Sequence, residues 1–226
     1  MGGIDAVIFD WGGTLTPWHT VEPLEAWLAA VGDDDLATRL LAAEQEVWVR
    51  SRDEHRSATL AEVFAAVDVA HTEEMLRSFH EWWEPHTFLD PDVPELFAAL
   101  RERDIRVGVL SNTIWPRSEH ERIFERDGVL DLIDGAVYTS EIPWTKPHPE
   151  AFRAALDAVD VSDPASAVFV GDRLFDDIHG AKSVGMRAVL VPHSDIPVTQ
   201  LGPVEGEPDA IIDRLSELVS VVDAWR

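Results

Sequence analysis

Cysteine is absent from the sequence, so neither disulfide bonds nor thiolate zinc sites can form. Lysine is nearly absent too, since the 226 residues contain only Lys146 and Lys182. No segment approaches the roughly 18 to 20 apolar residues of a membrane span. The N-terminal stretch MGGIDAVIFD has neither the basic flank nor the long apolar segment of a signal peptide. We therefore expect a cytoplasmic protein that has no membrane partner.

Positive charge is scarce, and the chain is strongly acidic as a result. Its 18 Lys and Arg residues stand against 43 Asp and Glu residues, which gives a formal charge of −25. Such a surface repels nucleic acids and anionic membranes and promotes solubility. The G-x-S-x-G and G-x-x-x-x-G-K-[ST] motifs of two other enzyme classes are missing. A small molecule is therefore the expected partner, while the oligomeric state is not predicted.

Short apolar runs alternate with helical patterns along most of the chain. The runs are residues 6–10, 105–112, 167–172 and 187–193. Their near-continuous Val, Ile, Leu and Phe content predicts strands buried on both faces, as in a parallel sheet covered by helices. Helical patterns cover 92–104 and 148–159, and 209–225 is interpreted as a short strand followed by a closing helix. This alternation predicts an α/β fold with a doubly wound, Rossmann-like parallel sheet.

Residues 17–83 interrupt that alternation, because they show helical spacing and no strand-like run. Apolar side chains recur there at i, i+3, i+4 and i+7, the spacing of one helix face. The two clearest stripes are Leu24, Trp27, Leu28, Val31 and Leu60, Val63, Phe64, Val67. We predict a small helical domain at 17–83, inserted into a core formed by 1–16 and 84–226, with its aromatic residues packed inside.

Polar residues stand at the ends of three of the predicted strands. Asp10 ends the first, Ser111 and Asn112 end the second, and Asp172 ends the third. Ligands of open parallel sheets bind outside the carboxyl ends of the strands, so these groups are predicted to share one site. Lys146, in the turn TKPHPEAF, is a further candidate because the chain uses so little lysine.

The segment GDRLFDDIHGA carries three acidic residues, Asp172, Asp176 and Asp177. Clustered carboxylates repel one another unless a cation lies among them, and oxygen ligands suit Mg²⁺. The alternative is a solvated acidic helix start, stabilised by the helix dipole, and Asp176 in particular fits that alternative. Arg173 is expected to face solvent at the same helix start.

Taken in order, FDWGGTL, VLSNT, TKPHPE and GDRLFDDIHGA resemble the motifs of the haloacid dehalogenase (HAD) superfamily. The match spans the predicted core, about two thirds of the chain. The resemblance implies a hydrolase that carries an α-helical cap, and residues 17–83 match that cap by position.

The resemblance also implies a metal site and a nucleophile. Asp10 would attack the substrate and form a covalent aspartyl intermediate, which requires a desolvated site assisted by a cation. Mg²⁺ would lie between Asp10, the backbone carbonyl of Gly12 and Asp172. Asp177 would be the nearby or water-mediated carboxylate.

Four further residues would handle the phosphoryl group, by the same resemblance. Ser111, together with the amide of Asn112, would hydrogen-bond a transferring phosphoryl oxygen. Lys146 would neutralise the charge that accumulates on the nucleophile and the phosphoryl group, and Thr14 would shape the nucleophile loop. The reaction implied is phosphoryl transfer by positioning and charge stabilisation.

Gly12 departs from the pattern of the family's phosphatases, which carry a second Asp two residues after the nucleophile. That Asp protonates the leaving group and then activates water, and loss of a general acid or base typically costs about 10²- to 10⁴-fold in rate. One interpretation is a phosphatase that is slow, prefers good leaving groups, or takes an acid from the helical domain. The residues available for that purpose are His19, Asp53, Glu54 and His55.

A second interpretation is a phosphate-binding module whose catalysis has lapsed. The presence of Asp10, Ser111, Lys146 and Asp172 favours an enzyme. Phosphonate-cleaving relatives have a similar nucleophile loop, but they need a lysine in the cap, and 17–83 contains none. Haloacid dehalogenases carry a bulky aromatic residue at the position of Gly12 and use no metal, so they do not call for the acidic segment.

Overall fold

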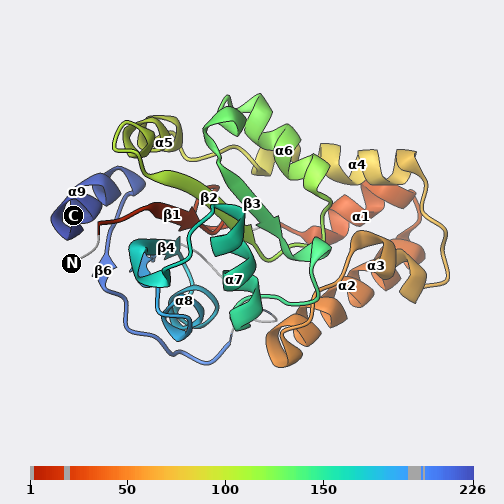
Figure 1. Cartoon of the computed structure of the whole chain (residues 1–226). Helices are drawn as coiled ribbons and strands as arrows, with labels where there is room; N and C mark the ends of the chain where they lie inside the picture. The colour runs from red at the N-terminus through yellow and green to blue at the C-terminus, as the bar shows by residue number, and fades with distance from the viewer. Residues whose placement is uncertain (1–2, 18–20, 193–199, 201) are drawn as a thin grey trace.

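The structure is a computed structural model that describes residues 3–17, 21–192, 200 and 202–226. Its six described strands form one sheet in the order β3-β2-β1-β4-β5-β6. They are β1 (Ala6–Phe9), β2 (Arg106–Ser111), β3 (Gly135–Tyr138), β4 (Ala167–Gly171), β5 (Arg187–Leu190) and β6 (Ala210–Ile211). All neighbouring pairs are parallel, which confirms the predicted fold class (Figure 1).

The chain builds the sheet outward from β1 in both directions. It runs from β1 through β2 to β3 on one side, then returns to β4 beside β1 and continues to β5 and β6. The strand order therefore reverses between β1 and β4, and such a reversal is where open α/β sheets bind their ligands. Asp10 and Asp172 directly follow the two strands that flank this point.

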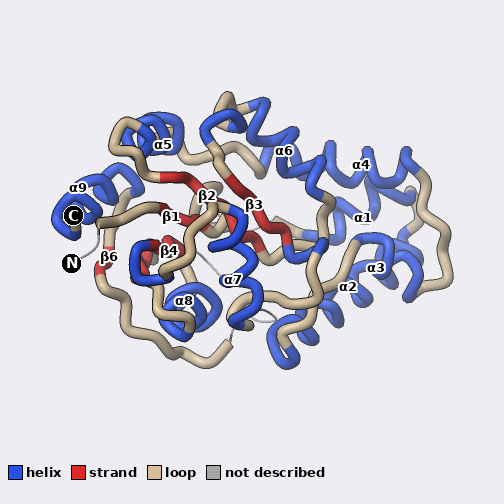
Figure 2. The backbone as a smooth tube through the Cα atoms, in the orientation of Figure 1, coloured by secondary structure: helices blue, strands red, loops and turns tan. Residues whose placement is uncertain are grey.

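Helices cover both faces of the sheet, as Figure 2 shows for the strands enclosed by helical segments. One face packs against α5 (Val93–Arg101), α6 (Arg117–Arg126) and α9 (Leu218–Trp225), and the other against α7 (Pro149–Ala158) and α8 (Gly180–Ser183). Alternate side chains of β1 enter the two clusters, which is why its sequence is apolar throughout.

Helices α1 (Pro23–Val31), α2 (Asp34–Glu54), α3 (Leu60–Ala66) and α4 (Glu73–Trp83) lie together at one end of the molecule (Figure 1). They share a hydrophobic cluster of their own, centred on three buried aromatic residues, Trp27, Phe64 and Phe79. Local caps set their starts. Asp33 accepts from the backbone N–H of Leu36, Thr59 from that of Glu62, and Thr72 from that of Met75.

Several predicted boundaries were wrong by one to three residues, because the strands end where their ladder hydrogen bonds end. The strand at 187–193, for example, stops at Leu190. Strand β3 was missed altogether, since its four residues GAVY form too short an apolar run to stand out. The strand and helix predicted within 209–225 are confirmed as β6 and α9.

None of the helices in the described part of the chain combines the length and the apolar character that crossing a bilayer requires.

His120 is a fully buried histidine on α6, where it packs against the loop that follows β1. Its Nε2 lies 3.0 Å from the Oγ1 of Thr113, and its ring stacks on Tyr138 with centroids 4.4 Å apart. The edge of the Trp11 ring closes the other side at 4.5 Å. Burial disfavours the imidazolium ion and lowers the pKa of His120 to about 3.

We predict that His120 makes the fold sensitive to acid. Its pKa is lower in the folded protein than the ordinary value of 6.5, so the unfolded chain binds a proton at His120 more readily than the folded protein does. The contribution of His120 to the free energy of unfolding is therefore complete above pH 6.5 and declines as the pH falls toward 3. Between pH 6.5 and about 4, the loss should approach roughly 3 kcal/mol in the free energy of unfolding. Urea denaturation should therefore show a smaller loss in His120→Gln than in wild type. An equal loss in both proteins would contradict this assignment.

Candidate active site

Asp10 begins the loop that follows β1 and lies at the reversal point of the sheet. Its backbone N–H still bonds the carbonyl of Val170 at 2.9 Å, so the residue is held as an extension of the β1–β4 ladder. Its side chain is buried, and the Oγ1 of Thr14 lies 3.4 Å from Oδ2. Gly13, with φ of 90°, adopts the left-handed conformation that the tight turn requires. The carboxylate is thereby fixed at the edge of the sheet.

Lys146 is the only buried lysine in the described part of the chain, and its side chain lies directly between two carboxylates. Its Nζ lies 2.5 Å from Oδ1 of Asp10 and 2.7 Å from Oδ1 of Asp177, and the side chain is 3% exposed. Burial alone would lower the pKa of Lys146, but the two carboxylates outweigh that effect and raise it. The residue therefore carries a fixed positive charge beside Asp10.

Three carboxylates meet beside this lysine. Asp10, Asp172 and Asp177 are all buried and each offers an oxygen within 4.8 Å of the others. Asp172 follows β4 directly, whereas Asp177 comes from a π-helical turn, Leu174–His179. In that turn the carbonyl of Arg173 accepts from the N–H groups of both Asp177 and Ile178. Such wide turns are frequent at functional sites, and here the turn carries Asp177 toward Asp10.

Gly171 makes the close approach of Asp177 possible. A β-carbon at position 171 would lie 2.4 Å from the carboxyl group of Asp177, a distance that real side chains do not tolerate. The Oδ2 of Asp177 also accepts from the backbone N–H of Arg173 at 2.9 Å. A glycine immediately before Asp172 is therefore a requirement of the acidic cluster.

The cluster fits a divalent cation by its donor set and its electrostatics. All three groups are oxygen donors, which hard cations such as Mg²⁺ prefer. Burial raises the pKa of Asp10, and the charge of Asp177 raises it further, although Lys146 opposes both. Three carboxylates held close together in a buried site repel one another, and this favours the binding of additional positive charge.

Ser111 ends β2, the strand on the other side of β1 from β4, and Asn112 follows it. Ser111 is almost fully buried, and the side chain of Asn112 hydrogen-bonds the backbone of Lys146. The structure thus brings together Asp10, Ser111, Asn112 and Lys146, which come from separate parts of the sequence. Gly12 lies two residues beyond the nucleophile and is half-buried.

The prediction that Arg173 and Asp176 face solvent at a helix start was wrong. The Arg173 side chain is only 15% exposed, with Nε 4.0 Å from Asp172 and Nη1 3.4 Å from Asp176. The surrounding carboxylates attract the guanidinium inward and raise its pKa despite the opposing effect of burial. Asp176 is not a solvated helix start either, since burial raises its pKa to about 6. The helix-start pattern gave no signal of these buried neighbours.

The acidic and histidine residues considered as substitutes for an acid at position 12 lie in different places. Asp53 and Glu54 are exposed, and Asp53 pairs with Arg52. His55 is half-buried, its carbonyl accepts from the N–H of Thr145 at 3.0 Å, and its ring lies 6.1 Å from that of Phe175. His19 lies outside the described residues. Among the described candidates, His55 contacts the segment that carries Lys146.

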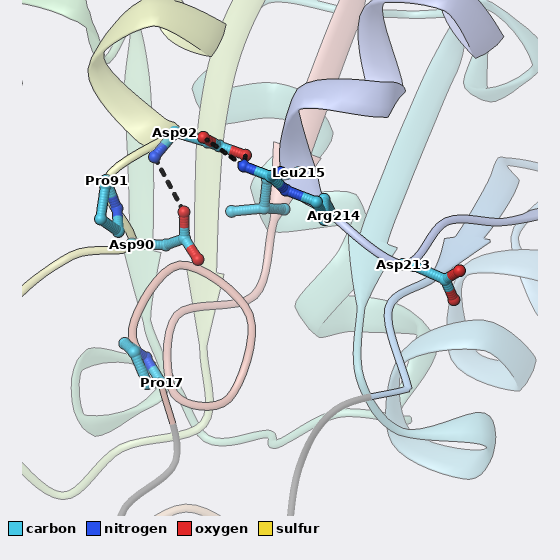
Figure 3. A pocket seen from close by; sticks show the side chains of 7 residues that line it. All are labelled: Pro17, Asp90, Pro91, Asp92, Asp213, Arg214 and Leu215. Atoms are coloured by element: carbon cyan, nitrogen blue, oxygen red, sulfur yellow. Dashed lines mark hydrogen bonds and ion pairs between the residues drawn. The ribbon is translucent and has the colours of Figure 1, made fainter.

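Two cavities differ in their relation to the acidic cluster. One, of about 260 Å³, is drawn in Figure 3 and is lined by Pro17, Asp90, Pro91, Asp92, Asp213, Arg214 and Leu215. Arg214 already pairs with Asp92 there, and the lining includes no predicted catalytic residue. The other, of about 240 Å³, is bordered by Asp172, Arg173, Phe175 and Asp176, so it opens beside the acidic cluster.

The loop that begins with Asp10, a buried lysine and an acidic cluster thus lie together at the reversal point of a parallel sheet, where such sheets bind their ligands. Residues 4–185 match a family described as haloacid dehalogenase-like hydrolase. The chain belongs to this family.

Relatives and solved structures agree with that membership. The chain is 27% identical to the glyceraldehyde 3-phosphate phosphatase of Methanopyrus kandleri, over 97% of each chain. The structure of a HAD phosphatase from Thermococcus onnurineus matches with a TM-score of 0.69 and 26% identity, covering 97% of this chain and 98% of that one. L-2-haloacid dehalogenase from Xanthobacter autotrophicus matches at 0.66 with 19% identity, covering 99% and 100%, which shows a common fold.

Proposed function

We propose that this hydrolase is a Mg²⁺-dependent phosphatase that acts on a small phosphorylated metabolite, with Asp10 as the nucleophile. The observation that carries the proposal is the position of Lys146 Nζ, within 2.7 Å of both Asp10 and Asp177. That arrangement fixes a cation where negative charge gathers during phosphoryl transfer. The relatives named as phosphatases support the same reaction class.

In the proposed reaction, an oxygen of Asp10 attacks phosphorus while the bond from phosphorus to the leaving oxygen breaks. The product is an aspartyl phosphate, which water then hydrolyses to inorganic phosphate and the free carboxylate. Lys146 balances the charge on the carboxylate and the phosphoryl oxygens. The hydroxyl of Ser111 and the backbone N–H of Asn112 donate to a phosphoryl oxygen, and Thr14 holds the carboxylate of Asp10 in place.

Mg²⁺ would be held by Asp10, the carbonyl of Gly12, Asp172 and Asp177, and it would supply further charge neutralisation. The three buried carboxylates, each with an oxygen within 4.8 Å of the others, support this set of ligands. Because the nucleophile and the lysine are buried, their electrostatic interactions are stronger than they would be in water.

We further propose that residues 17–83 form the cap and that 1–16 and 84–226 form the catalytic core. The hydrophobic cluster shared by α1–α4, which meets the core at Ile114 and Trp115, supports this division. Contacts between the two parts gather near the site, where the Oγ of Ser51 lies 3.0 Å from the Oγ1 of Thr145. A substrate held between the parts would have its leaving group enclosed by the helical domain.

Removal of the metal provides the test of this proposal. Wild-type protein should release phosphate from members of a panel of phosphate esters and acyl phosphates in the presence of Mg²⁺, and a chelator should stop the release. Asp172→Ala should weaken Mg²⁺ binding by at least about tenfold in calorimetry, because it deletes one of three anionic ligands. Ser183→Ala on α8 serves as a matched control.

Other outcomes would redirect the assignment. Unchanged Mg²⁺ affinity in Asp172→Ala would reject the metal site. Thermal stabilisation by phosphate compounds without any turnover would favour a binding module. Halide release from 2-haloacids that persists in the chelator would favour dehalogenation.

A further inference from the structure

We propose that the side chain of Asn112 is a positioning residue that holds Lys146 in register with Asp10. This role is distinct from that of the Asn112 backbone N–H, and its effect on turnover rests on the proposed function. The Oδ1 of Asn112 accepts from the backbone N–H of Lys146 at 2.8 Å. The Nδ2 of the same side chain donates to the backbone carbonyl of Lys146 at 3.1 Å. One amide therefore binds both polar backbone groups of one residue.

Lys146 needs this support because it lies between regular elements. The preceding 3₁₀ turn ends at Glu141, and α7 begins at Pro149, so no helix or strand of the described chain pairs the backbone of Lys146. Buried backbone N–H and C=O groups require partners. Asn112 provides both, and it extends directly from the end of β2, the strand beside β1. Asn112 thereby fixes the position of Lys146 relative to the sheet that also carries Asp10.

Lys146 must be placed accurately, which is why the two hydrogen bonds from the Asn112 side chain to its backbone, called the clamp below, matter. A lysine side chain has four rotatable bonds and binds as a point charge, without the fixed fork of arginine. Its Nζ nevertheless lies 2.5 Å from Asp10 and 2.7 Å from Asp177, among buried side chains. Because the two carboxylates come from different elements, the end of β1 and the π-helical turn, a shift of the Lys146 backbone would lengthen at least one of these contacts.

Asparagine is the smallest side chain that can make both bonds. It presents one acceptor oxygen and one donor NH₂ group, as a peptide does. Aspartate would still accept from the N–H of Lys146, but its second oxygen would face the carbonyl and repel it. Alanine would lose both bonds. The series Asn112, Asn112→Asp and Asn112→Ala therefore removes the clamp in two steps.

Hydrogen exchange measures the clamp directly. In Asn112→Ala, exchange of the Lys146 amide should accelerate at least tenfold, whereas the Thr145 amide, which bonds the carbonyl of His55, should keep its protection. In Asn112→Asp, the Lys146 amide should stay protected, because its acceptor remains. Unchanged protection of the Lys146 amide in Asn112→Ala would overturn the proposal.

The two lysines of the chain allow a second measurement, which needs no turnover. Acylation of Lys146, which is buried, should accelerate in Asn112→Ala relative to acylation of Lys182, whose side chain is 39% exposed and pairs with Asp209. An unchanged ratio of the two rates would count against the displacement of Lys146. The ratio is compared at equal free energy of unfolding, adjusted with urea, so that a general loss of stability does not change it.

Kinetics complete the test. A misplacement of about 1 Å can cost on the order of 10²-fold, so kcat should fall by roughly that factor in Asn112→Ala while KM changes little. Asn112→Asp should fall between wild type and Asn112→Ala. A wild-type rate in Asn112→Ala would overturn the positioning role. Absence of turnover in the wild type would instead reject the proposed function, and exchange and acylation would still decide the clamp.

Discussion

Asp10→Asn should abolish phosphate release. The substitution keeps the shape of the side chain but replaces the anionic oxygen with a neutral amide, which does not attack phosphorus. Loss of a covalent nucleophile elsewhere lowers kcat on the order of 10⁴- to 10⁶-fold, and a similar loss is expected here. The measurement is the rate of phosphate release from the best substrate of the panel, with Mg²⁺ present.

A matched control is needed because Asp10→Asn also removes a buried negative charge. Asp176→Asn deletes a neighbouring buried carboxylate that pairs with Arg173, at 3.4 Å, whereas Lys146 pairs with Asp10 and Asp177. It should keep most of the turnover. Both variants are expected to fold, because Lys146 keeps Asp177 as its partner in Asp10→Asn. A cooperative thermal unfolding transition in each variant verifies this. Full activity in a folded Asp10→Asn protein would reject the nucleophile assignment.

The sequence was sufficient to predict the fold class and most of the site, for a physical reason. Strands of a parallel sheet all deliver their carboxyl ends to one edge, so residues that end different strands meet in space. Asp10, Ser111 and Asp172 could be placed together on this ground alone. Lys146 could be singled out because lysine is so rare in this chain.

Other features depend on local geometry that hydrophobic spacing does not encode. The periodicity of GDRLFDDIHGA suits an ordinary helix, yet a π-helical turn brings Asp177, rather than Asp176, into the acidic cluster. Gly171 was the available signal, since a side chain at that position would displace Asp177. The side-chain partner of Asn112 lies 34 residues away in the sequence, and no motif spacing links the two.

Gly12→Asp should increase the hydrolysis of simple phosphate esters. If position 12 is where a general acid and base is missing, a carboxyl group restored there can protonate the leaving oxygen and then activate water. The expected gain is about 10²- to 10⁴-fold in kcat, and it should be largest for esters of poorly acidic alcohols. Acyl phosphates need no protonation of their leaving group, so their first step should gain little. The ratio of the two rates is therefore the measurement that isolates the acid.

Gly12→Asn provides the control, because it adds a side chain of the same size without an ionisable group. The left-handed backbone of this loop belongs to Gly13, with φ of 90°, and the substitution leaves that residue in place. A gain in Gly12→Asp that is absent from Gly12→Asn would show that the carboxyl group supplies the missing proton transfer. Equal rates in folded wild type and both variants would place the acid elsewhere, and His55, against the Lys146 segment, would be the next residue to replace.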